Sequence, residues 1–498
     1  MRDARALLVV SAATIACAGP PATTRSAPDV PPPALEAIAE ADLRRDVYAL
    51  AGDAMRGREA ATLDEMRATA WVAERAREAG LEPAGEDGTY FQFWPLRRAR
   101  ISSASRATLG GEALVLGRDA VLIAPVDAQG EWPVVAVGVT EAADGRRFEG
   151  QAVLAELVPP KELPAANVSL RGFRYARNAA REQGPPLAAR GAAAVILVAD
   201  STADAGLDYY GTVLTRGTYA LDSAGVDQRP RGVPVLILRR AWLERARRPG
   251  QRLALSISTE SFVYPSANVV ARVRGTNPAL GGEYVLFSAH QDHDGIKPPV
   301  SGDSIWNGAD DNATAAAALL AIGRAWKARP ARRSALFVWH GAEEKGLLGS
   351  RWHAQHPMVP REQIVAVLNA DMIGRNHPDS SGLLGSQPPH RNSTALVDAA
   401  LDANRRWIGF AVDSSWDRPT HPEGFYFRSD HLPYARAGVP AIFFTSQLHP
   451  DYHTPRDEPA TIDYRKLTRI ARWMYATGWM VANGEARPGV DPGFRLER

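Results

Sequence analysis

The chain has 498 residues, of which 45% are hydrophobic and 23% charged, a composition typical of soluble globular proteins. Its formal charge of +2 is spread over both signs, which argues against a nucleic-acid-binding surface. The length is sufficient for two or three domains, each with its own core. Beyond the N-terminus, no apolar run reaches the roughly 18 residues of a membrane-spanning helix.

The first 17 residues have the layout of a secretory signal, with two arginines before a mostly apolar run. The run ends in TIAC (14–17), which resembles a bacterial lipobox, where the cysteine is lipidated and becomes the mature N-terminus. Cys17 is the only cysteine, so no intrachain disulfide can form. We therefore expect a lipoprotein signal peptide over residues 1–17. A plain signal peptide, cleaved beyond Ala18 and giving a secreted protein, is the alternative.

A lipid on Cys17 would be the only link between the chain and a membrane. It would hold the protein at the bacterial cell envelope, facing the periplasm, and Ala18 after the cysteine favours the outer membrane. Residues 18–33 are rich in proline and are expected to form an extended tether.

After the tether, the predicted secondary structure changes from helical to mainly β-like. Helical patterns over 34–51 and 63–79 are followed by short β-like runs that alternate with loops and two helical stretches. We divide this part of the chain into four segments: an N-terminal part of the catalytic domain (34–100), a β-rich insert (101–262), the main catalytic domain (263–485) and a C-terminal tail (486–498). An elaboration of the catalytic domain itself is the alternative for the insert.

From residue 267, strand-like and helical segments alternate. The expected strands are 268–273, 283–290, 334–340, 363–371 and 439–446, and the expected helices are 313–327, 345–356, 393–406 and 464–482. Apolar runs this continuous are typical of strands buried on both faces. We therefore predict an α/β fold, a three-layer sandwich with a mixed, mainly parallel central sheet.

Five short segments supply two histidines and four carboxylates, the groups that two zinc ions and a general base require. They are AHQD (289–292), GADDN (308–312), GAEEKG (341–346), LNADMIG (368–374) and DYHTP (451–455). Zinc binds imidazole nitrogen and carboxylate oxygen, and a two-metal site also needs one bridging carboxylate. The segments fall at or just after predicted strand ends, where open α/β sheets place their sites. Five such segments in order predict a metallohydrolase.

These segments resemble those of the co-catalytic di-zinc aminopeptidase and glutamate carboxypeptidase family. Within it, the chain is similar to secreted bacterial members that carry an inserted protease-associated domain, here expected at 101–262. The resemblance extends from residue 43 to about residue 482. It implies a zinc exopeptidase-like fold and two Zn2+ ions per chain.

The resemblance also implies five metal ligands: His290, Asp311, Glu344, Asp371 and His453. The first zinc would be bound by His290 and Asp371, and the second by Glu344 and His453. Asp311 would bridge the two ions, and its choice over the adjacent Asp310 rests on the family motif alone.

Three further residues are expected to take part in catalysis. Glu343 precedes the ligand Glu344, and because adjacent side chains point different ways from a turn, Glu343 is the predicted general base. Asp292 lies two residues after His290 and is expected to accept the free imidazole N–H. Tyr452 is a candidate hydrogen-bond donor to the tetrahedral oxyanion, and a wall residue without a catalytic role is the alternative.

Most of the remaining histidines are interpreted as surface or loop residues: His293, His340, His353, His356, His377, His390, His421 and His449. His431, with Asp430, is expected to shape the pocket, and Trp306 to line the cleft.

The expected function is that of an aminopeptidase, which hydrolyses N-terminal residues from peptide substrates with a hydroxide shared by the two ions. A glutamate-carboxypeptidase-type enzyme is the nearest rival. It requires arginines beside the metals, and the candidates Arg375, Arg418 and Arg428 are scattered in the sequence. A glutaminyl cyclase-like acyltransferase and a catalytically inactive binding module are the remaining candidate functions. A binding module of this kind would lack metal ligands, and none is missing.

Overall fold

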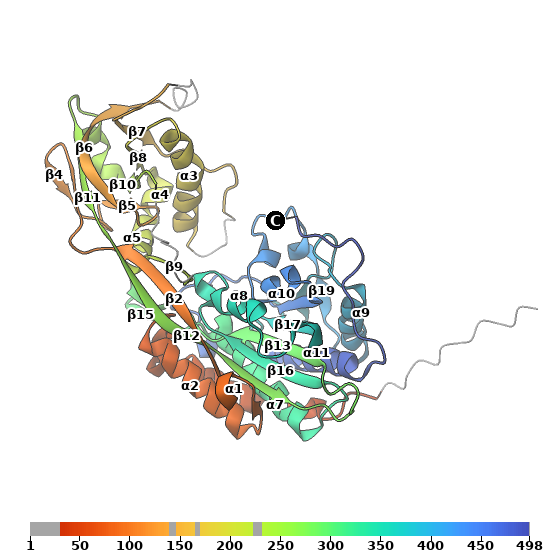
Figure 1. Cartoon of the computed structure of the whole chain (residues 1–498). Helices are drawn as coiled ribbons and strands as arrows, with labels where there is room; N and C mark the ends of the chain where they lie inside the picture. The colour runs from red at the N-terminus through yellow and green to blue at the C-terminus, as the bar shows by residue number, and fades with distance from the viewer. Residues whose placement is uncertain (1–29, 139–145, 165–169, 223–231, 498) are drawn as a thin grey trace, which may run out of the picture.

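The computed structural model describes residues 30–138, 146–164, 170–222 and 232–497, which form two sheet-based units (Figure 1). The predicted signal peptide and most of the predicted tether lie outside the described residues. Within these ranges, no helix combines the length and apolar character that crossing a membrane demands.

The larger unit is built on a mixed sheet with the strand order β19-β18-β20-β17-β13-β16-β12-β2-β9. The strands are β2 (Phe91–Ile101), β9 (Thr218–Leu221), β12 (Thr259–Val273), β13 (Tyr284–His290), β16 (Ser334–His340), β17 (Ile364–Ala370), β18 (Ser380–Leu384), β19 (Ala411–Asp413) and β20 (Ala441–Thr445), and β1 (Glu82–Pro83) pairs with β12. The central strands β16, β13, β17 and β20 are parallel, as is the pair β18 and β19. The α/β prediction with a mixed sheet is therefore confirmed.

Only part of the sheet is parallel, whereas a mainly parallel central sheet was predicted. Strand β12 pairs antiparallel with both β16 and β2, and β2 pairs antiparallel with β9. Antiparallel neighbours need no crossover helix, and β2 and β12 instead carry the chain to the smaller unit and back. Residues 268–273, one of the apolar runs from which a mainly parallel sheet was predicted, form the end of β12, whose two long pairings are antiparallel.

Helices cover both faces of the larger sheet. One face packs against α1 (Glu40–Leu50), α2 (Leu63–Glu78), α7 (Ala315–Ala328), α9 (Thr394–Ala403) and α11 (Tyr464–Asn483), and the other against α8 (Leu348–Gln355) and α10 (His431–Arg436). Side chains alternate between the two cores because successive residues of a strand point to opposite faces. Phe287 thus packs with the α7 and α11 side, and Leu286 with the α8 and α10 side.

The smaller unit has its own sheet and core. Its strand order is β4-β3-β11-β6-β7-β8-β10-β5, with β3 (Arg106–Leu109), β4 (Glu112–Leu114), β5 (Ala120–Leu122), β6 (Ala128–Ala136), β7 (Ala152–Glu156), β8 (Ala194–Val198), β10 (Val235–Leu238) and β11 (Arg252–Ile257). Helix α3 (Arg171–Ala188) packs on this sheet, and α5 (Leu207–Arg216) leads back towards the larger unit (Figure 1).

One part of the predicted insert belongs to the larger sheet. Strand β9 lies within 101–262, yet it pairs with Leu96–Ala99 of β2. The connection at the boundary is itself a strand pair, because Ile101 of β2 lies opposite Thr259 of β12. The two units are therefore joined by continuous hydrogen-bonded strands.

Candidate metal centre

The predicted ligands gather at one edge of the larger sheet. His290 ends β13, while Glu344, Asp371 and His453 follow β16, β17 and β20, respectively. Asp311 lies in the turn Ala309–Thr314, which leads into α7. Because β13, β16, β17 and β20 are parallel, their carboxyl ends meet at the same edge.

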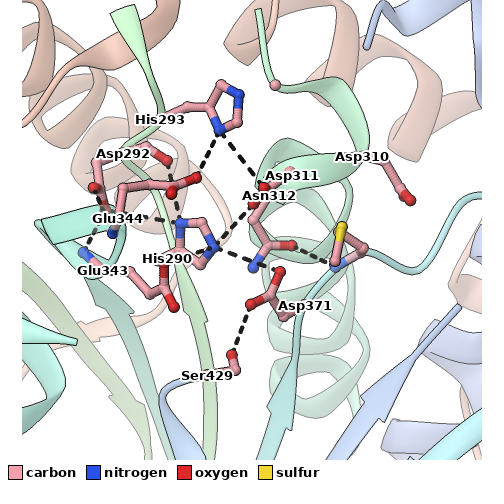
Figure 2. Close-up of polar contacts among 12 residues, drawn as sticks. His290, Asp292, His293, Asp310, Asp311, Asn312, Glu343, Glu344, Asp371 and Ser429 are labelled. Atoms are coloured by element: carbon pink, nitrogen blue, oxygen red, sulfur yellow. Dashed lines mark hydrogen bonds and ion pairs between the residues drawn. The ribbon is translucent and has the colours of Figure 1, made fainter. Parts of the chain in front are cut away.

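The first group of donors surrounds His290, which is buried (Figure 2). Its Nε2 lies 3.3 Å from Asp311 Oδ1, 3.5 Å from Asp371 Oδ1 and 3.8 Å from Glu343 Oε2. The other oxygen of Asp371 accepts a 2.7 Å hydrogen bond from Ser429. This bond fixes the carboxylate and directs Oδ1 to the imidazole.

The second group surrounds His453. Its Nε2 lies 3.1 Å from Asp311 Oδ2 and 3.2 Å from Glu344 Oε2. Asp311 therefore directs one oxygen to His290 and the other to His453, the position that a bridging carboxylate occupies. The adjacent Asp310 points elsewhere, and its Oδ1 accepts a hydrogen bond from the backbone N–H of Gly374.

The donors fit metal ions. His290 Nε2, Asp371 Oδ1 and His453 Nε2 are buried atoms that have no hydrogen-bond partner among the described residues. Unpaired buried polar atoms are costly, and imidazole and carboxylate together are a donor set that zinc prefers. Two groups have ligand atoms close enough to hold an ion: His290 with Glu343 and Asp371, and His293 with Asp311, Glu344 and His453.

His293 belongs to this centre: it lies in a loop, as one of the two interpretations had it, but it is not a surface residue. It is fully buried, and its Nδ1 lies 2.9 Å from Glu344 Oε1 and 3.8 Å from Asp311 Oδ2. The residue follows β13 in the same loop as Asp292 and Asp294. Its place three residues after His290, in AHQDHDG, is the sequence signal that could have identified it.

Asp292 contacts the imidazole of His290, the partner predicted for it, through its backbone oxygen more closely than through its carboxylate. The Nδ1 atom of His290 lies 3.1 Å from the backbone oxygen of Asp292 and 3.7 Å from its carboxylate. The carboxylate instead accepts hydrogen bonds from the backbone N–H groups of Glu343 (2.9 Å) and Glu344 (3.3 Å). The backbone oxygen of Asp292 thus contacts the imidazole, while its side chain holds the Glu343–Glu344 turn.

A carboxylate that was not predicted from the sequence orients His453. Oδ2 of Asp294 lies 3.0 Å from His453 Nδ1 and 2.5 Å from the Lys297 ammonium group. Lys297 donates a 2.6 Å hydrogen bond to the hydroxyl of Tyr209 and lies 3.8 Å from the centre of the Trp306 ring. Tyr209 belongs to α5 of the smaller unit. This unit therefore contacts Lys297, which pairs with the carboxylate that orients the candidate ligand His453.

Two buried groups hold the loops of the centre. The Arg58 guanidinium donates to four backbone carbonyls, those of Leu50, Gln291, Asn307 and Gly308. Asp457 accepts from the backbone N–H groups of Asp310 and Asp311. Neither role could be predicted from the sequence, because sequence motifs and charge patterns do not show which side chains bond to distant backbone groups.

The two adjacent glutamates have opposite ionisation tendencies. Burial, together with the nearby charges of Glu344 and Asp371, raises the pKa of Glu343 well above its ordinary value. Burial would also raise the pKa of Glu344, but His453 and His293 beside it lower that pKa to about 2. The environments of these neighbouring carboxylates thus push their pKa values apart, as is typical of paired carboxylates with different roles.

Tyr452 lies next to His453 on the wall of the site. Its hydroxyl accepts a 3.0 Å hydrogen bond from Arg428 Nη2. Burial raises the pKa of this phenol to about 12, so the hydroxyl keeps its proton at neutral pH. That proton is available for donation to a ligand.

Several other histidines interpreted as surface or loop residues are also buried: His340 and His353 in regular elements, and His390 and His449 in loops. His353 and His340 lie 2.7 and 3.3 Å from the hydroxyl of Tyr434 beneath the sheet edge. His431 is buried as well, stacked on Phe443. Trp306 is buried under Lys297 instead of lining an open cleft.

Residues 268–478 match the sequence model of Peptidase family M28. Aminopeptidase YwaD of Bacillus subtilis is 23% identical over 266 residues, which cover 52% of this chain and 53% of that protein. A probable leucine aminopeptidase of Arthroderma benhamiae is 27% identical over 213 residues, 40% of this chain and 53% of that protein. The predicted family resemblance is confirmed, although the matches span only about half the length of these curated relatives.

Solved structures share the fold over most of the chain. An aminopeptidase from Aneurinibacillus sp. strain AM-1 superposes with a TM-score of 0.59 and 17% identity, covering 92% of this chain and 97% of that one. A zinc aminopeptidase from Bacillus subtilis gives a TM-score of 0.57 and 18% identity, with coverage of 92% and 99%. Both units of the chain therefore have counterparts in known folds.

Proposed function

We propose that this chain, whose residues 268–478 match Peptidase family M28, is a zinc-dependent aminopeptidase that hydrolyses N-terminal residues from peptides. The observation that carries the proposal is the position of Asp311. Its two oxygens face the unpaired Nε2 atoms of His290 and His453, and Glu343 lies beside them.

Two zinc ions per chain are proposed, one held by His290 and Asp371 and the other by Glu344 and His453, with Asp311 between them. Zinc in such a site lowers the pKa of bound water and polarises the substrate carbonyl. His293 adds a nitrogen beside Glu344, either to orient that carboxylate or to extend the second donor set.

The role proposed for Glu343 is that of the general base. Its carboxylate takes a proton from the attacking water as the oxygen bonds to the peptide carbonyl carbon, and it returns this proton to the leaving amine when the C–N bond breaks. Asp292 holds the backbone of the Glu343–Glu344 turn, so that Glu343 keeps its position. Tyr452, with Arg428 donating to its hydroxyl oxygen, directs its own proton to the carbonyl oxygen as negative charge develops there.

The β-rich segment 101–262 is proposed to be a protease-associated insert that borders the substrate site. Arg216 of α5 donates a 2.6 Å hydrogen bond to the backbone oxygen of Asp294, and Tyr209 contacts Lys297. We expect Arg216→Met to raise the KM for peptides with little change in the circular dichroism spectrum. An unchanged KM would argue against this role.

We also propose that the protein is anchored to the bacterial cell envelope by a lipid on Cys17. The proposal rests on the TIAC segment (14–17) after an apolar run. Radiolabelled palmitate is expected to be incorporated by the full-length chain in a bacterial host but not by Cys17→Ser. Equal labelling of the two proteins would contradict the anchor.

The peptidase activity is tested by digesting a mixed set of peptides with the zinc-loaded protein and reading the products by mass spectrometry. Products shortened one residue at a time from the N-terminus, and abolished by a chelator, are expected. Shortening from the C-terminus would support a carboxypeptidase instead. A folded, zinc-loaded protein that cleaves no peptide would contradict the proposed function and favour a binding module.

A further inference from the structure

A cavity of about 400 Å³ lies between the two units, next to the metal centre. Helix α3 of the smaller unit and the loops around Glu423 and Tyr452 of the larger unit line it, and His453 forms part of its wall. This volume is in the range of sites that bind small ligands. Because His453 is a candidate zinc ligand, a molecule in the cavity adjoins the reacting peptide bond.

The lining of the cavity is rich in cations. Arg174 and Arg177 come from α3, and Arg428 comes from the larger unit. Arg174 and Arg428 both donate 2.7 Å hydrogen bonds to the same carboxylate oxygen of Glu423. One acidic side chain therefore neutralises two guanidinium groups only in part.

Arg177 has no acidic partner among the described residues. It forms no ion pair or hydrogen bond there, its Nε is buried, and the Phe173 ring lies 5.4 Å from its guanidinium carbon. Burial and the like charges of Arg181, Arg174 and Arg428 lower the pKa of Arg177. The remaining acidic residue of the lining, Glu162, is exposed.

A partly buried cation without a counter-charge is unfavourable, and a carboxylate that enters the cavity would reduce this cost through charge-assisted hydrogen bonds. The cations also reach the catalytic wall. Arg174 and Arg428 lie 5.8 and 5.7 Å from the centre of the Tyr452 ring, and Arg428 contacts the Tyr452 hydroxyl. The positive charge thus extends from the proposed oxyanion donor into the cavity.

We propose that Arg177, with Arg174 and Arg428, binds a carboxylate of the peptide substrate, so that the enzyme prefers short peptides with a free C-terminus or peptides with an acidic residue near the scissile bond. This inference rests on the proposed peptidase function and specifies its substrate class. A residue of extended chain spans about 3.5 Å, so a carboxylate one or two residues from the scissile bond enters a cavity that begins at His453.

The test compares matched substrates on the zinc-loaded full-length protein. The first arm uses di- and tripeptides with a free C-terminus and the same peptides as C-terminal amides. The second uses longer amidated peptides with either Glu or Gln after the scissile bond. We expect kcat/KM to be about 10- to 100-fold higher for the carboxylate-bearing member in at least one arm. The arm that shows this preference identifies whether the C-terminal or the side-chain carboxylate is bound.

Arg177→Gln is expected to abolish that preference through a higher KM for the carboxylate-bearing member, while hydrolysis of the uncharged member of each pair is unchanged. Arg177→Lys is expected to retain part of it. Arg181→Gln is the matched control, because Arg181 is exposed on the same helix and does not line the cavity. Zinc content and melting temperature are measured for each variant to separate misfolding from lost recognition.

Equal kcat/KM for the acid and amide members in both arms, or a preference that survives in Arg177→Gln, overturns the inference and leaves the peptidase proposal intact. Absence of hydrolysis of every peptide by the zinc-loaded wild type contradicts the proposed function itself.

Discussion

Asp294 Oδ2 lies 3.0 Å from Nδ1 of His453, on the side of the ring opposite to Asp311 and Glu344. The contact fixes the ring orientation and leaves Nε2 directed into the centre. A carboxylate behind a ligating histidine also raises the basicity of the ligand.

Asp294→Asn is therefore expected to lower the zinc affinity of the protein by about 10- to 100-fold. The measurement is isothermal titration calorimetry with zinc on metal-free protein. Asp303→Asn, at the exposed start of the short strand β15 (Asp303–Trp306), serves as the control. Unchanged affinity in Asp294→Asn would show that the contact does not support the metal site.

His293 provides a second prediction about metal binding. Because its Nδ1 contacts Glu344 Oε1, His293→Leu is expected to weaken zinc binding by about tenfold, while His293→Asn, whose amide nitrogen can occupy the place of Nδ1, retains most of it. Metal content after dialysis against a weak chelator checks this. Equal loss in the two variants would point to a steric effect instead of the contact with Glu344.

Arg58 is expected to matter for stability. Its replacement by Met leaves four carbonyls without this donor and should lower the free energy of unfolding by about 3–5 kcal/mol. Urea unfolding monitored by tryptophan fluorescence measures the change. Arg56→Met, in the same turn but exposed, should change it by less than about 1 kcal/mol.

Glu65 gives a prediction about pH. Burial raises its pKa to about 8 in the folded protein, against an ordinary value of 4.5, although it accepts hydrogen bonds from Ser266 and the backbone N–H of Ala61. Between these two pH values the folded state binds more protons at this site than the unfolded state. The contribution of Glu65 to stability therefore falls as pH rises from about 4.5 to about 8 and is constant above that.

For a single such proton, the free energy of unfolding falls by about 1.4 kcal/mol per pH unit. Glu65→Gln is expected to remove this pH dependence. The free energy of unfolding of the variant, relative to that of the wild type, should therefore increase as pH rises. Urea unfolding at pH 5, 6, 7 and 8 on metal-free protein measures this. A difference independent of pH would show that Glu65 is ionised in the folded protein throughout this range.

The larger unit was predictable because local patterns coincide there with the tertiary structure. The strand expected over 334–340 is β16 at Ser334–His340, and the helix expected over 464–482 is α11 at Tyr464–Asn483. Buried parallel strands are continuous apolar runs, and amphipathic helices repeat at the helical period, so both leave a signal in short windows.

Features that depend on distant partners were not predictable in this way. The pairing of β9 with β2 in the larger sheet joins segments about 120 residues apart, and no local pattern specifies it. The same holds for Asp294, whose role appears only when the loop of His453 folds over it. Of the arginines that looked scattered in the sequence, Arg428 lines the cavity, where it meets Arg174 and Arg177 only through the contact of the two units.

The most direct test of the central claim is the kcat of Glu343→Gln, measured with an N-terminally cleaved peptide at equal zinc content. We predict a fall of about 10²- to 10⁴-fold with zinc binding retained, because the base is lost while the five predicted ligands remain. A variant that binds zinc normally and keeps the wild-type kcat would contradict the assignment of Glu343, and with it the hydrolytic mechanism proposed for this site.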